Sequence, residues 1–178
     1  ALTRDESPAG ESAVGQVVAD AQLAATRAAA DGGAQIALMN PGGLRANLTA
    51  AADGAVRYED LFAVQPFYNN LVTLTLTGAQ IVQVLEQQWL NQPRPRVLQV
   101  SKGFAYAWDN TKPAGQRVVA GSVMLDGRPL DAAASYRVTV NSFLAAGGDN
   151  FGAFKQGRDV RTGMMDVDAF EQFIAKRP

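Results

Sequence analysis

The sequence predicts an α+β domain, a layered structure in which a mixed β-sheet packs against helices. Segments with the three- and four-residue apolar spacing of helices and segments with the two-residue alternation of strands both occur. They follow one another without the strict strand–helix alternation of a parallel α/β fold. The 178 residues, of which 47% are hydrophobic and 19% charged, suffice for one packed core, so we assign residues 1–178 to a single domain.

The first part of the chain predicts one helix and one strand. Residues 1–10 are polar and are expected to form a leading segment. Valines and alanines at helical spacing predict a helix from Glu11 to about Ala30, capped by Ser12 and ended by a Gly pair. The apolar run Ala34 to Met39 predicts a buried strand that leads into the loop Asn40 to Arg45.

The middle of the chain has the clearest pattern. Between Asn70 and Thr77, apolar residues alternate with threonines, as in a strand with one buried face. Thr77 is expected to cap a helix that continues to about Trp89, before Pro93 ends the region.

The last part predicts several strands and one helix. A Gly-rich loop at 147–152 separates the final strand from a C-terminal amphipathic helix. The expected strands are 97–100, 104–108, a hairpin over 117–130 and 136–140, and the expected helix is 167–175.

Composition excludes several functions. The chain has no Cys and no His, which removes thiolate chemistry, the usual general base and the commonest transition-metal ligand. Sixteen Lys and Arg against seventeen Asp and Glu give a net charge of −1, which argues against a nucleic acid as partner. No apolar run has the length of a membrane span.

Three loops carry candidate binding residues. In Asn40 to Arg45, the Gly pair permits close approach of a ligand and Arg45 offers a charged fork; a glycine turn with a solvated Arg is the alternative. Phe67, after Pro66, either stacks on a ligand or closes a core edge. Asp149, near Phe143 in the Gly-rich loop, either accepts hydrogen bonds from ribose hydroxyls or is an ordinary turn residue.

Taken together, these loops resemble those of one family. The motifs are Asn-Pro-Gly-Gly-Leu-Arg at 40–45, Gln-Pro-Phe-Tyr-Asn-Asn at 65–70 and Asn-Ser-Phe-Leu-Ala-Ala-Gly-Gly-Asp at 141–149. With Glu-Ser-Ala-Val-Gly at 11–15 and Leu-Gln-Val-Ser-Lys-Gly at 98–103, they resemble the C-terminal domain of the 5'-nucleotidase and UDP-sugar hydrolase family from Glu11 to Ile174.

The resemblance implies a set of substrate-binding residues. Phe67 and Phe143 correspond to two rings that sandwich the base, and Asp149 to the acceptor of the ribose hydroxyls. Asn40, Arg45 and Asn69 correspond to polar residues around the sugar and the phosphate. Stacking on two faces tolerates different bases.

The resemblance also implies that catalysis and substrate binding belong to different domains. Family members hold two divalent metal ions in an N-terminal metallophosphatase domain, the expected partner of this domain in the same polypeptide. No catalytic residue, metal ligand or cofactor is expected in this chain, and the chain alone is expected to be inactive. Because the chain begins at Ala1 rather than Met, we interpret it as an excised or processed piece.

Three positions depart from the family pattern. Pro41 stands where many relatives have Gly, and Asn150 follows Asp149 where Gly is common. Gly10 occupies the apparent position of a second phosphate-contacting Arg, which puts the full phosphate clamp in doubt.

The predicted function is nucleotide binding in an enzyme that releases phosphate from nucleoside 5'-monophosphates. The family also implies a periplasmic or secreted location. The alternatives are a relative acting on UDP-sugars, cyclic nucleotides, NAD or a sulfur carrier, and a non-catalytic binding module.

Overall fold

The computed structural model describes residues 1–177 and confirms the α+β class. A five-stranded mixed sheet has the strand order β3-β1-β7-β2-β8. Its central strands β1 and β7 run parallel, with Ile36 opposite Val138, and the other neighbours are antiparallel. The strands are β1 (Ile36–Met39), β2 (Asn70–Thr77), β3 (Gln99–Val100), β7 (Ser135–Asn141) and β8 (Arg158–Met165).

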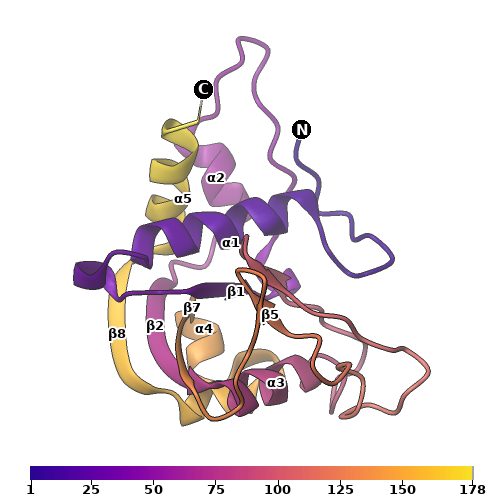
Figure 1. The fold of residues 1–178 in the computed structure, drawn as a ribbon. Coiled ribbons are helices and arrows are strands. Elements are labelled where there is room, and N and C mark those ends of the chain that lie inside the picture. The colour runs from indigo at the N-terminus through magenta and orange to yellow at the C-terminus, as the bar shows by residue number, and fades with distance from the viewer. Residues whose placement is uncertain (178) are drawn as a thin grey trace.

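Helices cover both faces of this sheet (Figure 1). One face packs against α1 (Ala13–Thr26), α2 (Tyr58–Val64) and α5 (Asp166–Ala175). The other packs against α3 (Gly78–Glu86), α4 (Ser142–Ala145), the 3-10 turn η4 (Gly152–Gln156) and a three-stranded sheet of β4 (Phe104–Ala105), β5 (Met124–Leu125) and β6 (Arg128–Pro129). Further 3-10 turns are η1 (Ala29–Asp31), η2 (Pro41–Gly43) and η3 (Gly148–Asn150). No helix within residues 1–177 is long and apolar enough to cross a membrane.

The predicted helix caps are present. The Ser12 hydroxyl accepts the N–H of Gly15 at 3.2 Å, and the Thr77 hydroxyl accepts that of Gln80 at 3.1 Å. Gly15 packs so closely on Gln99 that a Cβ there would collide with its side chain. Helix α1 is shorter than the predicted 11–30, because residues 29–31 form the separate turn η1.

Strand β2 has its predicted bounds but buries both faces. Val72, Leu74 and Leu76 enter the core beside α3, as the alternation predicted. Thr73 is nevertheless only 1% exposed, because α1 covers the other face. Its hydroxyl lies 2.8 Å from that of Thr139, which lies 2.7 Å from that of Thr26. Since Thr26 donates to the carbonyl of Gln22, this row of buried hydroxyls is hydrogen-bonded from end to end.

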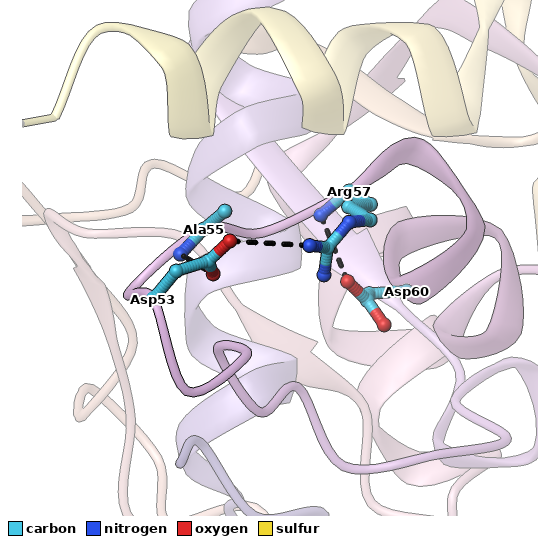
Figure 2. Close-up of polar contacts among 4 residues, drawn as sticks. All are labelled: Asp53, Ala55, Arg57 and Asp60. Carbon is cyan, nitrogen blue, oxygen red and sulfur yellow. Dashed lines mark hydrogen bonds and ion pairs between the residues drawn. The ribbon is translucent and has the colours of Figure 1, made fainter.

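The sequence analysis missed α2. This helix has seven residues, too few to show the helical period over several turns. Figure 2 shows how local contacts start it: the N–H of Arg57 donates to Asp60 at 2.8 Å, while its guanidinium pairs with Asp53 at 3.2 Å. Both partners of the ion pair are largely exposed, so it contributes little stability.

The edge strand β8 was also missed. Val160 is 60% exposed, and the strand lacks the alternation of a half-buried strand. Its pairing with β2 is interrupted by two register shifts. The predicted strands 97–100 and 104–108 are shorter than expected, since only Gln99–Val100 and Phe104–Ala105 form ladders. The predicted hairpin is confirmed, but only as β5 and β6.

Asp166 couples the stability of this fold to pH. The side chain is 2% exposed at the start of α5, and burial raises its pKa to about 6. Because the folded state then holds a proton that the unfolded chain releases at about pH 4, ionisation of Asp166 destabilises the fold. The loss of stability begins near pH 4 and is complete above about pH 6.

We therefore expect Asp166→Asn to stabilise the domain at pH 7.5 by about 2 to 3 kcal/mol, since one pKa unit corresponds to about 1.4 kcal/mol. Asn retains the oxygen that accepts the N–H of Val167. Thermal unfolding should show a Tm gain of roughly 5 to 10 °C at pH 7.5 and almost none at pH 4. Glu171→Gln, on the exposed face of the same helix, is the control. A lower Tm at pH 7.5 would show instead that the carboxylate stabilises the helix N-terminus.

Candidate functional site

Two asparagines lie where the central parallel strands end. Asn40 follows β1 and Asn141 ends β7, and both are buried, with exposed fractions of 3% and 1%. The amide of Asn141 donates to Oδ1 of Asn40 at 2.9 Å. Its own oxygen accepts the N–H of Leu144 at 2.9 Å and so caps α4. The carboxyl ends of β1 and β7 are thereby joined by side chains as well as by the ladder.

Asp149 continues this chain of hydrogen bonds. The Asn40 amide donates to Asp149 Oδ2 at 3.1 Å. Asp149 has a φ of 56°, a left-handed conformation that Asp tolerates better than most residues. Within residues 1–177 its other oxygen, Oδ1, has no hydrogen-bond donor. One carboxylate oxygen is therefore held by the protein, and the second remains available to a ligand.

A single cavity of about 1110 Å³ brings all six predicted site residues together. The six come from four separate segments: the loop after β1, the loop before β2, the start of α4 and the turn η3. They are Asn40, Arg45, Phe67, Asn69, Phe143 and Asp149. This volume is slightly above the range of about 300 to 1,000 Å³ that is typical of small-molecule sites.

Two phenylalanines present their rings at this cavity instead of filling the core. Phe67 is 52% exposed and Phe143 is 43% exposed. A ring with about half of its surface exposed gains only part of the energy of full burial, which argues against the alternative in which Phe67 closes a core edge. The ring of Phe143 packs on Gly148, where an added Cβ would lie 2.6 Å from three ring carbons.

Arg45 lies beside Phe67. Its guanidinium carbon is 5.9 Å from the centre of that ring, within the range of a cation–π interaction. Nη1 donates to the carbonyl of Gly42 at 3.4 Å, while the backbone N–H donates to Val64 at 2.9 Å. The backbone is fixed, and the exposed guanidinium keeps donors for an anionic ligand.

Asn69 is held from two sides. Its Oδ1 accepts the hydroxyl of Ser142 at 2.9 Å, and its carbonyl accepts the N–H of Asp166 at 2.8 Å. Between Phe67 and Asn69 the chain turns at Tyr68, which has a φ of 55° and contacts Phe62 with ring centres 5.1 Å apart. This left-handed residue lies between two residues that both line the cavity.

Three arginines that the sequence analysis did not select also line the cavity: Arg4, Arg94 and Arg96. Arg4 donates to the carbonyls of Leu44 and Arg45, both at 3.2 Å, and ties the leading segment to the Arg45 loop. The alternation of Pro and Arg over 93–96 was interpreted only as the end of a helix, although its repeated charge was a usable signal.

Gly10 has a structural explanation. It is buried with a φ of 85°, and a Cβ there would lie 2.6 Å from the side chain of Val97. No larger side chain fits at this position without a shift of Val97.

The side chains at this site limit the ligands that it can bind. Among residues 1–177 no three His, Cys, Asp or Glu side chains are grouped as a metal site requires. A cavity that combines exposed rings, a held carboxylate and arginines suits a ligand with a planar apolar part, hydroxyl groups and negative charge.

Comparison with known proteins identifies a family model and several relatives. A family model described as "5'-nucleotidase, C-terminal domain" matches residues 1–156. A cell wall protein of Listeria monocytogenes is 35% identical over 97% of this chain and 23% of its own length. A trifunctional nucleotide phosphoesterase of Bacillus subtilis is 33% identical over 93% of this chain and 11% of its own length.

A solved structure of a 5'-nucleotidase precursor is also similar to this chain. The 5'-nucleotidase precursor from Thermus thermophilus has a TM-score of 0.78 and 36% identity, over 97% of this chain and 34% of that one. The chain therefore spans between about a tenth and a third of the length of these relatives.

The contact between Gly148 and Phe143 can be tested with a matched pair of variants. Gly148→Ala should displace the Phe143 ring, because the new Cβ takes its place, whereas Gly152→Ala adds a Cβ into open space. Neither glycine has a positive φ, so the backbone tolerates both changes. We expect the ring resonances of Phe143 in NMR spectra to shift in the first variant only. Unchanged ring resonances in Gly148→Ala would show that the ring does not pack there in solution.

Proposed function

This chain belongs to the family of 5'-nucleotidase C-terminal domains, and from that membership we propose that it is the substrate-binding domain of a phosphohydrolase that acts on nucleoside 5'-monophosphates. The observation that carries the proposal is the convergence of six residues, predicted from sequence, on one cavity. Two of them are aromatic rings about half exposed at the cavity, where a planar ligand could cover them.

The base would stack on Phe67 and Phe143. Base–aromatic stacking contributes about 1 to 3 kcal/mol per base and does not depend strongly on base identity. Gly148 supports this role, because a glycine is what lets the η3 turn lie against the ring of Phe143. The cation–π contact of Arg45 with Phe67 would orient the second ring in the same way.

The ribose would bind to Asp149. Ribose hydroxyls donate well to a carboxylate, and Oδ1 is available for them. Asn40 donates to Oδ2 and so fixes the orientation of the carboxylate before the ligand arrives. Preorganisation of this kind reduces the ordering cost of binding.

The phosphate would extend toward Arg45, a permanently charged group suited to phosphate oxygens. Binding in one place and reaction in another explains a chain without His or Cys. The proposal thus includes a two-metal centre in an N-terminal metallophosphatase domain of the same polypeptide, with residues 1–178 as the domain that positions the substrate. The sequence that precedes residue 1 tests this part: Asp-x-His and Gly-Asn-His-Glu motifs there support the enzyme, and their absence supports a non-catalytic module.

A periplasmic or secreted location is part of the same proposal. It is supported by the relative that is named a cell wall protein. UDP-sugars, cyclic nucleotides and NAD remain alternative substrates, and each contains a base that the same two rings would stack on. The rings argue against a sulfur carrier, which offers no planar group to stack.

The first prediction concerns binding by the chain alone. Adenosine should bind weakly and shift the NMR signals of Phe67, Phe143 and Asp149. Phe143→Ala should remove most of the effect, with at least a tenfold loss of affinity, which corresponds to about 1.4 kcal/mol of stacking. Tyr58→Ala is the control, because Tyr58 is an exposed aromatic residue on α2 that does not line the cavity. Equal losses in both variants, or no shift with adenosine, would contradict the proposal.

The second prediction concerns catalysis. The chain alone should release no phosphate from AMP with added manganese, zinc or magnesium, because residues 1–177 contain no group of three possible metal ligands. The measurement is phosphate release against a protein-free blank. Release that a chelator abolishes would require a reaction centre within this chain.

A further inference from the structure

The cavity is lined by three arginines in addition to Arg45, the residue that the proposed function assigns to the phosphate. Arg4, Arg45, Arg94 and Arg96 line it, together with the carboxylates of Asp5, Glu6 and Asp149. None of these arginines forms an ion pair with the described residues, since the one ion pair within 1–177 joins Asp53 to Arg57. An arginine that forms no ion pair keeps its charge for another anion, together with the N–H donors that no protein oxygen accepts.

Arg94 and Arg96 are carried by a stiff segment. Pro93 and Pro95 fix φ on both sides of Arg94 and limit the backbone of the residue before each proline. The N–H of Arg96 donates to the carbonyl of Gln88 at 2.9 Å. Ordering these two side chains around a ligand therefore costs little backbone entropy.

Gln92 connects this segment to the ribose acceptor. The Arg96 guanidinium donates to Oε1 of Gln92 at 2.5 Å. The Gln92 amide donates to the carbonyl of Asp149 at 2.6 Å. Arg96 is thus two hydrogen bonds away from the residue that we assign to the ribose: Gln92 bonds the backbone of Asp149, whereas Asn40 bonds its side chain.

Hydrogen bonds between segments show which parts of the chain lie next to one another at the cavity. The segment with Arg94 and Arg96 lies beside the leading segment, because Gln99 donates to the carbonyl of Gly10 at 2.9 Å and accepts the N–H of Ser12 at 2.8 Å. The two rings come from the loop before β2 and from the start of α4. The segment with the arginines contacts the backbone of Asp149 through Gln92, and Arg94, Arg96 and Asp149 line the same cavity as the two rings. A ligand that is stacked on the rings and bonded to Asp149 would therefore share its cavity with the arginines.

We propose that Arg94 and Arg96 form a second anion subsite, which binds a phosphate beyond the one next to the ribose and makes the cavity prefer nucleoside diphosphates to monophosphates. This subsite rests on the proposed function, which places the base at the rings. Two guanidinium groups offer paired N–H donors that match the oxygens of a terminal phosphate. The subsite depends on residues separate from those assigned to the base, the ribose and the first phosphate.

The test is calorimetric titration of the full 178-residue chain with adenosine, AMP, ADP and pyrophosphate, at low salt and without metal. We expect ADP to bind about tenfold more tightly than AMP, the gain typical of a hydrogen-bonded charge pair. The double variant Arg94→Gln/Arg96→Gln should reduce ADP to the affinity of AMP and leave adenosine and AMP unchanged. The control is Arg128→Gln/Arg158→Gln, which removes two exposed arginines that do not line the cavity. Thermal unfolding checks that each variant is folded.

The outcomes separate the two proposals. The subsite is overturned if the double variant still prefers ADP, or if the unchanged protein binds ADP and AMP equally. In either case, binding of adenosine would still support the proposed function. If adenosine does not bind, the proposed function fails, and pyrophosphate decides the subsite by itself. Pyrophosphate binding that depends on Arg94 and Arg96 supports the subsite, and its absence overturns it.

Discussion

The parallel pairing of β1 with β7, at the centre of an otherwise antiparallel sheet, determines where the rest of the molecule lies. Parallel neighbours end at the same edge, so the loops that follow both strands leave the sheet side by side. Parallel pairs are stable when both faces are covered, which is why α1 and α5 pack on one face and α3 on the other. The edge where β1 and β7 end is the place where an α/β sheet most often binds a ligand.

At that edge the buried residues fix the geometry of the site, whereas the exposed residues remain accessible to a ligand. Asn40 and Asn141 are buried amides that would destabilise the fold without partners, so their hydrogen bonds fix them in one arrangement. Asp149 is oriented by this arrangement. Phe67 and Phe143 remain exposed. We interpret Asn40 accordingly as a residue that positions the carboxylate, in addition to the sugar contact that the resemblance implies.

Sequence reasoning succeeded where one physical signal acted over several residues. The alternation in β2 gave its bounds, and the polar caps Ser12 and Thr77 gave the starts of α1 and α3. It failed for α2 and β8, whose positions depend on packing and on pairing with distant residues rather than on their own pattern. The candidate site residues were predicted from the resemblance of the loop motifs to a family, and the structure brings these residues to one cavity.

The details of the site could not be found in that way. Nothing in the local sequence indicates that Gln92 reaches Asp149, 57 positions away, or that the Phe143 ring rests on Gly148. The charges of Arg94 and Arg96 are plain in the sequence, but only the three-dimensional arrangement brings them to the same cavity as Arg45. Side chains from distant segments meet at a place that the strand order creates.

The two edges of the sheet have a consequence for the behaviour of the protein at high concentration. An edge strand exposes unpaired backbone groups that invite a second chain to extend the sheet, which is the first step of aggregation. Here one edge, β3, is only two residues long. The other, β8, carries Arg158, Asp159 and Arg161, and its register shifts disturb the regular spacing that an added strand requires. The irregular, charged strand that sequence patterns failed to find is therefore the feature that protects the sheet from growing by addition of another chain.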